Sequence, residues 1–198
     1  DAKFSPRVSL NYSAGDKKQH NIRGSFQTGF RNPDTQALFI GFDVGRAILV
    51  GSSPDNLDRR LPGTDLTGQD AYFNSYTRTS VEAFAATGDP TLLEAVVTPL
   101  VQQEKVTAFD IGYRGKIGPI NLDANLYYNM YDGFINQQIV ITPENGSTAD
   151  PSGIADIVTG QYEAFQLYTN STEQIQSYGF VVGGNFKFAE NFVFGVNY

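Results

Sequence analysis

Residues 107–130 read TAFDIGYRGKIGPINLDANLYYNM and contain two successive runs in which apolar and polar side chains alternate. A period of two places all apolar side chains of a strand on one face and the polar ones on the other. Residues 118–119 (GP) separate the runs and have the length of a hairpin turn. The stretch therefore predicts two antiparallel β-strands, residues 107–117 and 120–130, each with one apolar face.

The same alternation recurs outside this hairpin. It is found at residues 7–13, 21–31, 178–188 and 192–198. Short turns at residues 14–19 and 189–191 join these runs in pairs, whereas residues 32–104 and 133–174 form two long connections. The pattern predicts an all-β, antiparallel arrangement of about six strands with two long loops.

The first long connection also contains signals for short helices. Residues 79–82 (TSVE) fit a capping box, and Gly88 would end the helix that follows. Asp89 and Pro90 fit the start of a second helix that would run towards Pro99. We therefore expect two helices inside residues 32–104.

Three details favour a transmembrane β-barrel over a soluble β-protein. The strands have about ten residues, their polar faces carry Arg, Asp, Lys and Asn, and short turns alternate with long loops. The short turns are then expected on the periplasmic side, and both long loops are expected to be extracellular. The alternative is a soluble β-sandwich or barrel module that binds carbohydrate or protein through its long loops.

Composition excludes several other classes. The chain has 198 residues, no Cys, one His and a formal net charge of −7. Such a charge opposes a nucleic-acid partner, and no base and nucleophile can be paired for an enzyme. The acidic residues of the first connection lack the spacing of an EF-hand, so neither a metal nor a cofactor is expected.

Particular stretches resemble the barrel of TonB-dependent outer-membrane receptors of the Bacteroidota type. Together they cover nearly the whole chain in order. They are residues 6–10 (PRVSL), 20–33 (HNIRGSFQTGFRNP), 54–57 (PDNL), 88–93 (GDPTLL), 104–115 (EKVTAFDIGYRG) and 126–135 (LYYNMYDGFI). The resemblance implies a plugged barrel of the roughly 22-stranded class in the bacterial outer membrane. It further implies uptake of a nutrient of unknown identity with energy from the TonB complex.

Six strands are too few to close a barrel in lipid, because the smallest outer-membrane barrels have about eight. Residues 1–198 are therefore expected to be part of a single larger β-barrel domain. The plug that contacts the TonB complex, and the remaining strands, would lie outside this chain. Outer-membrane lipid and a surface lipoprotein that acts as a lid are the other partners that the resemblance implies.

Two groups of residues are candidates for contact with substrate or partner. The first consists of charged side chains on the polar strand faces, and the second of aromatic side chains in the first long loop. They are Arg23, Arg31, Asp110 and Arg114 in the first group, and Phe39, Phe42, Tyr72, Phe73 and Tyr76 in the second. The alternative for the charged group is a network that packs against the plug or pairs across strands. The alternative for the aromatic group is packing within the loop.

Overall fold

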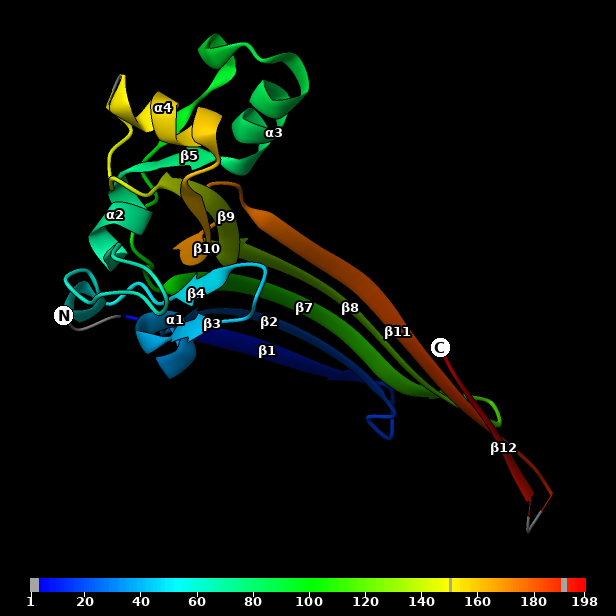
Figure 1. Ribbon diagram of the computed structural model, residues 1–198. Coiled ribbons are helices and arrows are strands. Elements are labelled where there is room, and N and C mark those ends of the chain that lie inside the picture. Colours follow the sequence, from blue (N-terminus) through cyan, green and yellow to red (C-terminus); the bar gives the residue numbers. More distant parts are fainter. Residues whose placement is uncertain (1–3, 150, 190–191) are drawn as a thin grey trace. The chain divides into compact units, whose positions relative to one another are not determined.

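The computed structural model describes residues 4–149, 151–189 and 192–198, and it divides into two compact units (Figure 1). The strand unit comprises Asp1–Arg31, Lys105–Asp132 and Glu173–Tyr198. The loop unit comprises Asn32–Glu104 and Gly133–Thr172, which are essentially the two long connections. Both units contain a six-stranded sheet.

All six predicted strands are present in the strand unit, and several extend beyond their predicted bounds. In sheet order they are β1 (Arg7–Ala14), β2 (His20–Arg31), β7 (Glu104–Ile117), β8 (Ile120–Asp132), β11 (Ile175–Ala189) and β12 (Phe192–Asn197). Gly118, at φ +58°, lies in the turn between β7 and β8, where a side chain would strain the backbone. Glu190 and Asn191, in the third expected turn, lie outside the described residues.

Strand pairing gives this sheet two different faces. Ile111 of β7 pairs with Leu126 of β8, which pairs with Phe180 of β11, so one row of the apolar face crosses three strands. Their side chains are 57%, 55% and 57% exposed, because no other element of the strand unit covers them among the described residues. A large uncovered apolar face is unusual for a protein in water and indicates that another apolar phase contacts it.

The loop unit is a mixed sheet with helices, rather than two separate loops. Its sheet order is β3-β4-β10-β9-β5-β6, and β4 and β10 are parallel. The strands are β3 (Gly41–Asp43), β4 (Ile48–Val50), β5 (Ser75–Thr77), β6 (Ala95–Val96), β9 (Ile135–Pro143) and β10 (Tyr162–Asn170). The helices are α1 (Thr35–Phe39), η1 (Pro54–Asn56), α2 (Gly68–Phe73), α3 (Arg78–Thr87), η2 (Pro90–Leu92) and α4 (Ser152–Thr159). None of the described helices has the length and apolar character needed to cross a membrane.

A hydrophobic core stabilises the loop unit. Val140 of β9 and Phe165 and Leu167 of β10 are fully buried in one cluster, together with Val50 of β4 and Tyr72 of α2. A second, smaller cluster lies around Tyr76, Val81, Ile141 and Ile157. Both long connections contribute to each cluster, so the two connections fold together.

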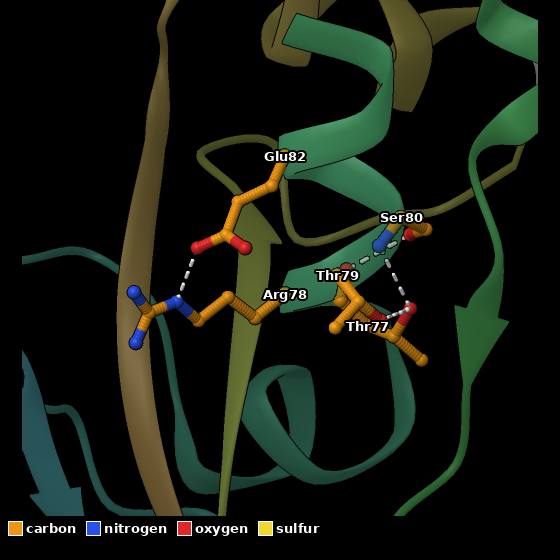
Figure 2. Close-up of polar contacts among 5 residues, drawn as sticks. All are labelled: Thr77, Arg78, Thr79, Ser80 and Glu82. Carbon is orange, nitrogen blue, oxygen red and sulfur yellow. Dashed lines mark hydrogen bonds and ion pairs between the residues drawn. The ribbon is translucent and has the colours of Figure 1, made fainter. Parts of the chain in front are cut away.

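The first expected helix is confirmed, but its predicted cap is wrong. Helix α3 begins at Arg78, and the N-cap is Thr77, whose hydroxyl accepts a hydrogen bond from the Ser80 amide at 3.3 Å (Figure 2). Glu82 does not close a capping box with Thr79; it pairs with the Arg78 guanidinium at 2.6 Å, one helical turn away. Gly88 ends the helix at φ +74°, as predicted.

The second expected helix is wrong beyond its first turn. Asp89 does cap it, and Pro90 follows, but the result is the single 3₁₀ turn η2. The chain is extended again at Leu93, and Ala95 and Val96 pair with β5 as strand β6. Pairing with the sheet has thus overridden the helical signal.

The corrected cap gives a testable expectation. Thr77→Ala should lower the stability of the loop unit by about 1 kcal/mol, because it removes the acceptor for the Ser80 amide. Thr79→Ala is the matched control and should have little effect, since Thr79 lies exposed in the first turn of α3. Thermal unfolding of the two variants would compare them, and a larger loss for Thr79→Ala would contradict the assigned cap.

Candidate functional site

Charged side chains from three neighbouring strands meet on the polar face of the strand unit. The guanidinium groups of Arg23 in β2 and Arg114 in β7 each lie 3.8 Å from a different carboxylate oxygen of Asp123 in β8. Beside them, the Asn125 amide donates a hydrogen bond of 3.1 Å to the carboxylate of Asp110. Strand register explains the cluster, because Arg114 is paired directly with Asp123 across β7 and β8.

Three of the four predicted charged residues are therefore brought together. Asp123, which bridges the two arginines, and Asn125 were not predicted as site residues, although both belong to the polar half of an alternating run. Arg31 is exposed at the last position of β2, outside this cluster. The register between strands determines which residues face one another, and alternation in the sequence does not reveal it.

The polar face is hollowed at two places beside this cluster. One hollow, of about 540 Å³, is lined by all members of the cluster except Asp123 and by polar residues of β1 and β2 such as Asn11 and Ser25. The other, of about 470 Å³, has Arg114, Lys116 and Asp123 among its lining residues. With its two arginines, two carboxylates and several amides, this face offers hydrogen-bond donors and acceptors to water or to a polar ligand.

The aromatic candidates of the loop unit separate into buried and exposed residues. Tyr72 and Tyr76 are 0% and 3% exposed and belong to the two core clusters, which matches the alternative of packing within the loop. Phe73 is half-buried and packs against the first cluster. Phe39 and Phe42 are 46% and 61% exposed and remain available for contact.

Tyr72 is held in place by backbone oxygen atoms. Its hydroxyl lies 3.0 Å from the Tyr168 carbonyl oxygen and 3.2 Å from that of Val50, so it donates within the core. Burial raises the pKa of Tyr72, because the phenolate would lose its hydration. The hydroxyl therefore stays protonated and has a structural role. Among the described residues, no three His, Cys, Asp or Glu side chains are placed to hold a metal ion.

One of three comparisons with known proteins found a match, and it agrees with this arrangement of strands. A search of curated proteins and a search of solved structures found no match. A family model, described as TonB dependent receptor-like, beta-barrel, matches residues 1–198. The match covers the alternating strands and both long connections. The chain therefore belongs to the β-barrel family of TonB-dependent receptors, which are transporters and receptors rather than enzymes.

Proposed function

We propose that the chain forms part of an outer-membrane receptor of the Bacteroidota type that takes up a nutrient with energy from the TonB complex. Its family is normally located in the bacterial outer membrane and supports nutrient transport in general. The observation that carries the proposal is the two-faced sheet of the strand unit. One face is apolar and uncovered, and the other gathers Arg23, Arg114 and Asp123.

In this proposal the apolar face contacts lipid, and the polar face lines the interior of the barrel. Transmembrane barrels use this alternation, because lipid cannot hydrate charged side chains whereas a wet lumen can. Leu126 and Asn125 are neighbours on β8 and would point to the two different environments. The hollows beside Arg114 and Asp110 would then line part of the substrate path.

The loop unit would lie on the extracellular side and contribute to contact with substrate or with a lid lipoprotein. Loops on a rigid scaffold are common positions for binding residues. Phe39 and Phe42 are the aromatic side chains that support this part of the proposal, because both are exposed. Tyr72 and Tyr76 would act indirectly, by holding the core on which these residues are displayed.

Cysteine labelling in intact outer membranes would test the assignment of the two faces. Residues 1–198 contain no Cys, so each single-cysteine variant would carry one label in this part of the receptor. We expect Asn125→Cys to react with a charged, water-soluble maleimide and Leu126→Cys to be protected by lipid. The pair Asp110→Cys and Ile111→Cys should repeat this contrast on β7. Ready labelling of Leu126→Cys together with protection of Asn125→Cys would show that the faces are inverted.

A further inference from the structure

The loop unit contains a polar cleft to which the proposed uptake assigns no role. Its cavity measures about 530 Å³ and is lined by Arg60, Leu61, Gly63, Thr64 and Asp65, by Glu144, which directly follows β9, and by Glu163 of β10. A smaller hollow of about 160 Å³ adjoins it and shares Gly63 and Glu163. Small-molecule sites typically have volumes of roughly 300–1,000 Å³, so the larger cavity has the size of a ligand site.

The sheet positions two glutamates in this cleft. Tyr162 of β10 pairs with Pro143 of β9, and the next amide, that of Glu144, donates to the Gln161 carbonyl at 3.1 Å. This pairing fixes the backbone beneath both Glu144 and Glu163. By strand alternation Glu163 lies on the same face as the buried Phe165, and its side chain is half-buried at the end of that apolar row.

The charges of the cleft do not cancel. Arg60 is paired with Asp65, and its Nε donates to the Thr64 carbonyl at 3.1 Å, so its positive charge is already compensated. In the described part of the chain, the carboxylates of Glu144 and Glu163 have neither a hydrogen bond nor an ion pair. Asp43 and Arg46 line the adjoining hollow and add one charge of each sign, so the excess of two carboxylates remains.

The net charge of the whole loop unit also favours a positively charged ligand. Residues 32–104 and 133–172 contain fourteen Asp or Glu against four Arg and no Lys, which gives a formal charge of −10. The strand unit contains seven Asp or Glu against ten Lys or Arg and is therefore net positive. A strongly negative unit attracts cations to a recessed site and repels anions.

We infer that this cleft binds a small organic cation with an amine or guanidinium group. Such a group donates several hydrogen bonds to carboxylates and forms charge-assisted pairs with them. A bare metal ion fits less well, because the described residues do not gather three metal-ligating side chains. The inference does not depend on the proposed uptake, since the lining of the cleft contains neither Phe39 and Phe42 nor any residue of the polar strand face.

Titration calorimetry on the receptor purified in detergent would test the inference. Agmatine, which carries an amine and a guanidinium group, is the probe; 1,4-butanediol and succinate are its neutral and anionic counterparts. We expect agmatine to bind, the other two not to bind, and Glu163→Gln to weaken agmatine binding about tenfold or more. Glu94→Gln removes the same charge at an exposed position outside the cleft and should leave the affinity nearly unchanged.

Several results would overturn the inference. They are absence of agmatine binding to the unaltered receptor at millimolar concentration, equal binding of butanediol, and equal affinities of Glu163→Gln and Glu94→Gln. Glu144→Gln provides a second variant, because this glutamate is exposed and its replacement does not disturb the core. Its affinity should also fall, so the test remains decisive if Glu163→Gln lowers the folded yield.

Discussion

Phe165→Ala is expected to unfold the loop unit selectively. The Phe165 side chain is fully buried in the first core cluster, between β4 and β9. Removing a buried phenylalanine costs about 3–5 kcal/mol, because apolar contacts are lost and a cavity remains. We expect a protease added to the purified receptor to cleave within residues 32–104 or 133–172 far faster than in the unaltered protein.

Gln166→Ala is the matched control for this experiment. Gln166 is the next residue of β10, lies on the opposite face and is half-buried, where it contacts Gln137. Its replacement should change the cleavage rate little, because surface substitutions usually cost within about 0.5 kcal/mol. If Phe165→Ala were as resistant to protease as Gln166→Ala, the first cluster would not be the core that stabilises the loop unit.

Leu126→Arg is expected to prevent or strongly impair insertion of the barrel. Leu126 is 55% exposed on the apolar face and lies at the middle of β8, between Ile111 and Phe180. An arginine on the lipid face near the bilayer midplane costs about 2–4 kcal/mol. The fraction of receptor assembled in outer membranes, measured by heat modifiability on gels, should therefore fall.

Asn125→Arg places the same charge one residue earlier, on the polar face. There it would lie beside the Asp110 carboxylate, which already accepts a hydrogen bond from Asn125. Assembly should be close to that of the unaltered receptor. Equal losses for Leu126→Arg and Asn125→Arg would indicate that β8 has no lipid-facing side.

The strand unit was predictable because its two faces differ. Apolar and polar residues alternate at residues 107–117 and 120–130, and the structure continues both runs, with β7 starting at Glu104 and β8 ending at Asp132. The loop unit lacks such a signal. Its β3, β4, β5 and β6 have only two or three residues, too few to establish a period.

The central strands of the loop unit were missed for a different reason. Residues 140–143 of β9 are all buried, so successive side chains do not alternate between an apolar and a polar environment. Strands covered on both faces lose the period-two signal. The capping box of α2, formed by Thr67 and Asp70, was present in the sequence but has Asp in place of the more common Glu or Gln.

For the charged site, the sequence predicted which residues lie on the polar faces but not which of them interact with one another. Arg23, Asp110 and Arg114 could be assigned to polar faces from alternation alone. Asp123, which bridges two arginines, became evident only from the register of β7 and β8 and the proximity of β2. For Tyr72 and Tyr76 the location itself was not predictable, because an aromatic side chain fits a core as well as a binding surface.

The order of strands in the loop-unit sheet has a consequence for biogenesis. The central strands β9 and β10 come from the later segment, whereas β3, β4, β5 and β6 come from the earlier one. During synthesis from the N-terminus, Val50 and Tyr72 are therefore made long before the strands that cover them, with the β7–β8 hairpin still to be synthesised between. Such distant pairings form slowly and expose apolar surface in the meantime. Residues 32–104 consequently lack the strands that complete their core until β10 has been synthesised.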